Sequence, residues 1–162
     1  MRSQVRAEHA RVDARSTEDL ADLLNQSLAE TLDLAFQTEQ ARRNAKGQDA
    51  HELCLVFDHL HGQLATYVED LDARAVTLCG QGLGALPSAQ RLSSITAAPP
   101  GVLVRKVRLD DLVDSCGEYA GRMRKAIRKA EKLGQHDTAD FYSSVSRDMD
   151  HTLWMLTAHE EA

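Results

Sequence analysis

The position of proline constrains the fold of this chain more than any other feature of its sequence. Its prolines, Pro87, Pro99 and Pro100, all lie in one middle segment. Because proline breaks helices, the long proline-free stretches on either side remain free to form them. Aromatic residues make up only 4% of the 162 residues, and leucine and alanine dominate the apolar ones. The sequence therefore predicts an all-α fold, and its length is typical of one compact domain.

A first helix is expected over residues 16–44. Ser16 and Thr17 precede two acids, which is the chemistry of a helix cap and first turn. An apolar stripe follows at four-residue intervals, formed by Leu20, Leu24, Leu28, Leu32 and Phe36. Gly47 is expected to end the helix region. Residues 1–15 have no apolar stripe, so we predict a flexible arginine-containing arm there and a bundle over residues 16–162.

Further helices are expected over residues 49–79, 109–133 and from a cap at Asp137 to about His159. Gly80 and Gly134 follow the first two of them, and a short helix is expected over residues 87–95. The apolar side of the 49–79 helix is formed by Leu53, Phe57, Leu60, Leu64, Leu71, Ala75 and Leu78. This order, with a long crossover in the middle, predicts a ferritin-like four-helix bundle whose second and third helices are parallel.

The composition also limits the cellular compartments and the classes of protein that are consistent with this sequence. The cysteines, Cys54, Cys79 and Cys116, are odd in number and far apart, so we expect no disulfide framework and a cytoplasmic location. Charged residues interrupt the apolar stretches, so no membrane association is expected. Residues 1–15 lack the apolar segment of a secretory signal.

The distribution of charge gives only weak support for nucleic-acid binding. The net charge of −6 does not indicate a dedicated nucleic-acid binder. The N-terminal arm is nevertheless weakly basic, and its arginines are Arg2, Arg6, Arg11 and Arg15. Contacts of such an arm with DNA phosphates would be non-specific and sensitive to salt. A second basic cluster, formed by Arg122, Arg124, Lys125, Arg128, Lys129 and Lys132, is interpreted mainly as a solvated helix face.

Several stretches resemble the Dps (DNA protection during starvation) family, the mini-ferritins. The most informative are His136-Asp137-Thr138-Ala139-Asp140, Ser146-Arg147-Asp148-Met149-Asp150 and Leu153-Trp154. Others are Leu23-Leu24-Asn25, Gln40-Ala41, Arg74-Ala75-Val76 and Arg124-Lys125-Ala126-Ile127. The similarity extends from about Leu20 to Leu156. It implies a dodecamer of two-fold dimers around a hollow centre, iron as the bound metal without an organic cofactor, iron storage and protection of DNA.

The resemblance also implies where a ferroxidase centre would lie, and most of its ligands are substituted. The family uses a histidine on the first helix, a histidine and an aspartate on the second, and an aspartate and a glutamate from the partner subunit. The matching positions here are Arg42, Cys54, Asp58, Glu69 and Ala73. Arginine has no lone pair for a metal and its charge repels a cation. We therefore expect Arg42 to form ion pairs with Asp58 and with Glu69 of the partner subunit in place of metal.

The resemblance further implies a pore. In the family the start of the fourth helix lines a three-fold pore through which iron enters, and the matching residues are Asp137 and Asp140, with His136 beside them. Three copies of each acid would produce a negative potential that attracts cations. Both acids also suit the first turn of their own helix, so the two interpretations stand together.

Alternative metal ligands and alternative functions remain open. His51, Cys54, Asp58 and His61 share one helix face and could hold zinc or iron. The more ordinary interpretation is that His51 lies in solvent, Cys54 is a small buried residue and His61 faces a neighbour. Glu39 lies near Arg42 and could also reach a metal. The chain is thus a cage with a working centre, a cage without one that stores metal or compacts DNA, or a helical protein that forms no cage.

Overall fold

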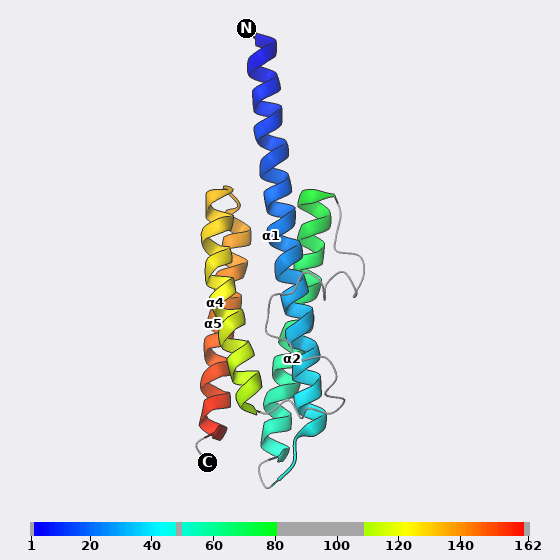
Figure 1. The fold of residues 1–162 in the computed structure, drawn as a ribbon, viewed down its shortest axis with the longest axis vertical. Coiled ribbons are helices and arrows are strands. Elements are labelled where there is room, and N and C mark those ends of the chain that lie inside the picture. Colours follow the sequence, from blue (N-terminus) through cyan, green and yellow to red (C-terminus); the bar gives the residue numbers. More distant parts are fainter. Residues whose placement is uncertain (1, 48–49, 81–108, 161–162) are drawn as a thin grey trace.

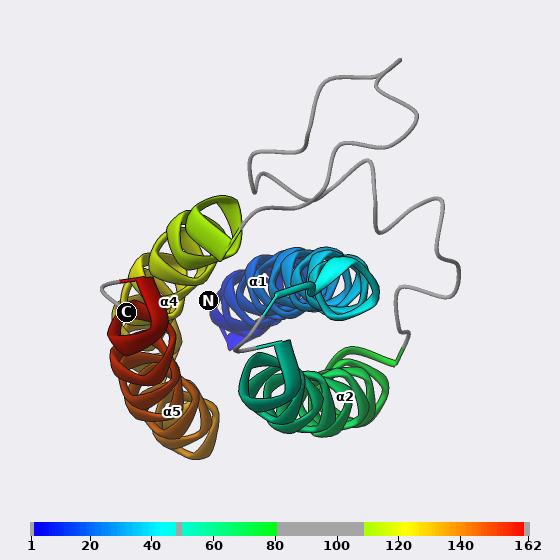
Figure 2. The same cartoon turned by 90° about the horizontal axis from the view of Figure 1, so that it is seen from below.

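Four helices form a bundle in the computed structural model, and the helices that contact one another run in opposite directions. The structure describes residues 2–47, 50–80 and 109–160, and within those ranges it describes side chains from residue 14 to residue 158. The helices are α1 (Arg2–Asn44), α2 (Ala50–Cys79), α4 (Leu109–Lys132) and α5 (His136–Glu160). α1 packs mainly on α2, and α4 on α5; α1 also contacts α4, and α2 contacts α5 (Figures 1 and 2). The predicted four-helix bundle is therefore confirmed. As predicted, α2 and α4 run in the same direction (Figure 1). The short helix expected over residues 87–95 lies outside the described residues.

The predicted C-terminal ends of the helices agree closely with the structure. Gly47, Gly80 and Gly134 all adopt positive φ angles, of 111°, 79° and 71°. After α4, Gly134 donates to the carbonyl of Glu131 at 3.0 Å and Gln135 donates to the carbonyl of Ala130 at 2.9 Å. These two bonds satisfy carbonyls that the end of a helix leaves unpaired, and they require a left-handed residue at Gly134.

Two predicted helix starts are wrong. α1 begins at Arg2 rather than at Ser16, and its N-terminal part projects beyond the other helices (Figure 1). Residues 2–15 are rich in arginine and alanine, whose helix propensity continues the helix through the expected cap. α5 begins at His136, so Asp137 lies inside the first turn rather than at the cap. An acid there still interacts favourably with the helix dipole.

The core is mainly leucine and lies where the helices face one another. Leu24, Leu34, Leu60, Leu64, Leu71, Leu112, Tyr119, Met123, Tyr142 and Met149 are fully buried. Phe36, predicted on the apolar stripe of α1, is 60% exposed, and Leu78 of α2 is 42% exposed. A strict four-residue spacing advances about 40° around a helix at each step, so Phe36 has turned away from the face that Leu20 buries. None of the helices in the described ranges is long and apolar enough to cross a membrane.

Polar residues of α1 also enter the core and link it to α4 and α5. Ser27, Glu30 and Thr31 are at most 3% exposed. The hydroxyl groups of Thr31 and Tyr119 lie 2.8 Å apart, and the Tyr142 hydroxyl donates to Ser27 at 2.9 Å. The buried carboxylate of Glu30 accepts a hydrogen bond from Gln26 at 2.8 Å and forms an ion pair with Arg122 of α4 at 3.6 Å. The bundle is therefore held by a polar network as well as by leucine packing.

Candidate metal centre between α1 and α2

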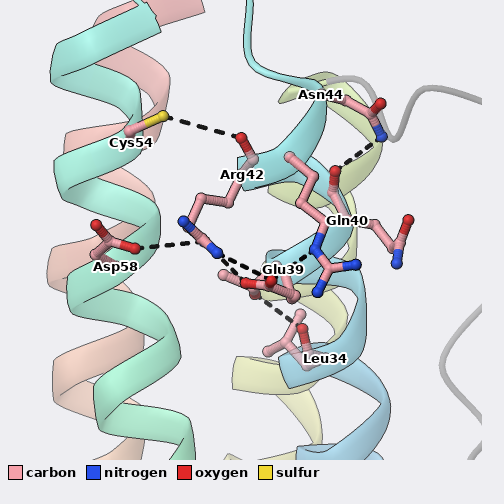
Figure 3. A network of polar contacts seen from close by, with 9 residues as sticks. Leu34, Glu39, Gln40, Arg42, Asn44, Cys54 and Asp58 are labelled. Carbon is pink, nitrogen blue, oxygen red and sulfur yellow. Dashed lines mark hydrogen bonds and ion pairs between the residues drawn. The ribbon is translucent and has the colours of Figure 1, made fainter.

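The last turns of α1 lie beside the first turns of α2, because only a short connection separates these helices. Figure 3 shows Arg42 on α1 pointing toward Asp58 on α2, with Cys54 one turn before it. The Arg42 Nε atom lies 3.4 Å from Asp58 Oδ1. The predicted ion pair between Arg42 and Asp58 is therefore confirmed within one chain, and a guanidinium occupies the space in front of this carboxylate.

Glu39 completes the cluster around Arg42. Its Oε2 atom accepts a hydrogen bond from Arg42 Nε at 2.8 Å, and its Oε1 atom accepts from Arg42 Nη2 at 3.0 Å and from Arg43 Nε at 2.7 Å. These two arginines lower the pKa of Glu39 from 4.5 to about 2. In turn, the hydrogen bond to Glu39 raises the pKa of Arg42. Both Glu39 oxygens are thus engaged by arginine. The sequence indicated this role of Arg43 only through its four-residue spacing from Glu39.

Replacing Glu39 with glutamine is expected to reduce the acid sensitivity of the fold. Because its folded-state pKa of about 2 is below 4.5, the stabilisation from Glu39 is fully present above pH 4.5 and is lost as the pH falls toward 2. Thermal unfolding followed by circular dichroism across this window measures the effect. The wild-type Tm should fall more steeply than that of Glu39→Gln, and Glu18→Gln, on an exposed acid of the same helix, is the control. Equal slopes for wild type and Glu39→Gln would contradict the role of Glu39.

The alternative ligand set on α2 does not come together within one chain. The Cys54 Sγ atom points toward α1 and lies 3.9 Å from the Arg42 carbonyl oxygen, within reach of a weak hydrogen bond. His51 is exposed and His61 is partly buried. In the described ranges, no group of three or more His, Cys, Asp or Glu residues is placed to hold a metal ion. The shared helix face of His51, Cys54, Asp58 and His61 is therefore not sufficient to make a site.

Glu69 and Ala73 lie on the same helix as Asp58, and both are exposed. Glu69 is about 16 Å beyond Asp58 along the axis of α2, given the rise of a helix. It therefore cannot reach Arg42 of its own chain. Any site that combines Asp58 with Glu69 needs a second subunit.

The residues matched to the pore lie at the opposite end of the bundle from this cluster. His136, Asp137 and Asp140 are all exposed at the start of α5. Asp140 borders a hollow that Arg124 and Arg147 also line. The neighbouring arginines weaken the negative potential around Asp140. Of the arginines assigned to the N-terminal arm, Arg15 is exposed, and the side chains of the other three lie outside the described set.

Comparisons with known proteins agree with this architecture. Residues 21–161 match the ferritin-like domain family model, Ferritin. The DNA protection during starvation protein of Agrobacterium fabrum is 36% identical over 146 residues, which cover 90% of this chain and 89% of that protein. Dps from Thermosynechococcus elongatus has the same fold, with a TM-score of 0.81 at 16% identity, over 91% of this chain and 94% of that one. Dps from Vibrio cholerae O1 gives a TM-score of 0.77 at 22% identity, over 90% and 91%. The chain therefore belongs to the Dps family of ferritin-like proteins.

Proposed function

We propose that this chain forms a hollow cage that binds and stores iron and protects DNA from oxidative damage, and that its ferroxidase centre is degenerate. Family membership and the name of the Agrobacterium relative support DNA protection. The Vibrio protein is described as a member of the ferritin-like diiron-carboxylate superfamily, which supports iron as the cargo. Iron is the substrate here rather than a resident cofactor.

The observation that most directly supports a degenerate ferroxidase centre is the position of the Arg42 guanidinium in front of Asp58. Iron prefers oxygen and imidazole donors. Of the residues matched to the family's ligands, Asp58 and Glu69 offer carboxylates, whereas Arg42 and Ala73 offer no donor atom. The Cys54 thiol lies against a backbone carbonyl. A ferrous ion would have to displace a cation that Glu39 and Asp58 already hold.

We further propose a dodecamer built from two-fold dimers, as the family membership suggests. Such an interface would bring Glu69 of the partner subunit toward Arg42, so that this cation would be shared by carboxylates of two chains. The exposure of Glu69, Ala73 and the large apolar side chains Phe36 and Leu55 supports a covered surface on the α1–α2 hairpin.

Two further roles follow from the same assembly. His136, Asp137 and Asp140 would line a three-fold pore for iron entry, although the arginines beside Asp140 would weaken its attraction for cations. The arm that carries Arg2, Arg6, Arg11 and Arg15 continues α1 as a helix beyond the bundle (Figure 1). In the proposed cage this arm would carry its basic residues to the outer surface. Repeating the arm on every subunit raises avidity for DNA without new contacts.

The alternative is a cage that oxidises no iron and acts mainly in DNA binding or as a structural assembly. The Arg42–Asp58 ion pair supports this function equally well, since it argues only against the chemistry at this site. A relocated metal site at His51, Cys54 and His61 would need donors from another subunit, because they do not converge within one chain.

Ferrous iron, added without oxygen to the purified assembly and then exposed to peroxide, separates these functions. We expect ferric absorbance to rise no faster than in buffer, both in wild type and in an Asp58→Ala, Glu69→Ala double variant. We also expect iron to co-elute with the assembly in size-exclusion chromatography. A fast rise that the double variant abolishes would contradict the degenerate centre. Failure of iron to co-elute would contradict iron storage and would favour the alternative cage, which acts mainly in DNA binding or as a structural assembly.

A further inference from the structure

The three tyrosines of the chain lie in the core, but their hydroxyl groups have different partners. Tyr119 and Tyr142 each meet a hydroxyl group of α1. The Tyr67 hydroxyl of α2 instead donates to Asp148 Oδ2 of α5, at 2.6 Å. This distance is typical of a charge-assisted bond to a carboxylate. Tyr67 is therefore the one tyrosine whose proton faces a base.

That difference decides which tyrosine loses an electron most readily. A phenol that loses an electron becomes a strong acid, so its oxidation is favourable where a base at hydrogen-bond distance accepts the proton in the same step. Asp148 is such a base, and a neutral hydroxyl group is not. Tyr67 is only 8% exposed, and its burial raises its pKa. Its proton consequently stays in place until an electron leaves, and the buried ring is shielded from other molecules.

An exposed aromatic side chain lies on the same helix as Asp148, six residues further along α5. Trp154, the single tryptophan of the chain, is 69% exposed and stacks on His151, with 6.0 Å between ring centroids and 16° between planes. Asp148, His151 and Trp154 follow one another at three-residue intervals, so they lie on successive turns of the helix. Trp154 is about 9 Å beyond Asp148 along the axis.

Phe141, which packs on the Tyr67 ring, limits transfer of the radical from Tyr67 to the other tyrosines of the core. Its ring packs edge-to-face on Phe141 at 6.1 Å, and Phe141 packs on Tyr142 at 5.5 Å. The Arg74 guanidinium lies over the Phe141 ring, 4.4 Å from its centroid. A cation at this distance disfavours positive charge on the ring, so Phe141 separates Tyr67 from Tyr142.

We propose that Trp154, Tyr67 and Asp148 form a one-electron relay that consumes oxidising radicals at the protein surface. An oxygen-centred radical takes one electron from Trp154 and is reduced to its anion. Tyr67 then gives an electron to the indole radical cation while its phenolic proton passes to Asp148. The products are a neutral tyrosyl radical and a neutral carboxylic acid.

The relay is reset by a small thiolate at the surface, which becomes a thiyl radical as it gives one electron to the tyrosyl radical by way of the exposed Trp154 ring, while Asp148 returns the proton. No metal takes part, so the relay is independent of the proposed iron storage. The role of Trp154 is entry of the oxidising equivalent, that of Tyr67 is its protected storage, and that of Asp148 is to hold the proton.

Pulse radiolysis with the azide radical tests the relay in the assembled protein, because this radical oxidises indoles by one electron. In wild type we expect the indolyl absorption to decay as a phenoxyl absorption grows, at a rate independent of protein concentration and slower in deuterated water. Tyr67→Phe should abolish the growth of the phenoxyl signal. Asp148→Asn retains an oxygen acceptor but no base, and should slow the transfer by about a hundredfold. Tyr119→Phe and Tyr142→Phe are matched controls that should leave it unchanged.

The Tm and the mass of each assembly show whether a variant is folded. A phenoxyl signal that survives in folded Tyr67→Phe, or that disappears equally in Tyr119→Phe, would overturn the relay. A Tyr67–Asp148 bond that merely links two helices would change the Tm of the variants without any deuterium effect on wild type. Should Tyr67→Phe fail to fold, the deuterium effect and the rate in Asp148→Asn decide the question.

Discussion

Replacing Arg42 and Cys54 with histidine and Ala73 with glutamate is expected to raise the initial rate of ferrous oxidation by about a hundredfold or more over wild type. The change removes the guanidinium from in front of Asp58 and supplies imidazole and carboxylate donors at the positions matched to the family's ligands. Asp58 and Glu69 would then coordinate iron instead of a cationic side chain. Stopped-flow ferric absorbance after mixing with ferrous iron and peroxide measures the gain.

The matched control is the same triple variant with Asp58→Ala added, which should return the rate to that of buffer. Arg42→His alone tests whether removing the cation suffices, and we expect it to produce only a small part of the gain, since Ala73 still offers no ligand. If the triple variant assembles normally and remains as slow as wild type, the proposed position of the degenerate centre is wrong.

Replacing Arg122 with methionine is expected to cost about 2–3 kcal/mol in the free energy of unfolding. Its partner Glu30 has a side chain only 4% exposed, so removal of the guanidinium leaves a carboxylate in the core of the bundle. The bond from Gln26 remains, and the Arg122 side chain is 33% exposed, so the cost should not exceed that range. Chemical denaturation at one fixed subunit concentration measures it.

A second ion pair of α4, this one with α5, provides the control. Arg124 lies 2.9 Å from Asp150, but both side chains are about half exposed, at 47% and 56%. Arg124→Met should therefore cost under about 1 kcal/mol, although its bond is shorter. Adding Glu30→Gln to Arg122→Met should recover most of the lost stability, because no charge then remains buried. Equal costs for Arg122→Met and Arg124→Met would show that burial of Glu30 does not decide the effect.

The places where sequence and structure differ have local causes. The apolar residues of α1 indicated a helix correctly, but a strict spacing of four residues predicted Phe36 in the core. The buried series of α1 instead continues through Leu28, Thr31, Leu34, Thr38 and Ala41, which follows the true helical period. Ser16 has the chemistry of a cap, yet the helix-forming residues before it extend α1 to Arg2.

The candidate centre was predictable to the extent that it depends on helix ends and sequence spacing. The helix end near Asn44 and the short connection place Arg42 opposite the first turns of α2, and the spacing of Cys54 and Asp58 puts them on one face. The sequence did not show that Glu39 would use both oxygens on arginine, because a flexible carboxylate has several donors within reach. The geometry of the neighbouring helix decides among them.

The sequence alone determined the number of main helices, their ends shortly before Gly47, Gly80 and Gly134, the parallel second and third helices, and the ion pair of Arg42 with Asp58. These features depend on periodicity, backbone preference and residue type, all of which are local. Only the tertiary structure decided that Glu30 meets Arg122 and that Tyr67 meets Asp148. Such pairs join residues far apart in the chain, and they depend on the rotation and axial register of each helix, which are set by the packing of side chains between helices.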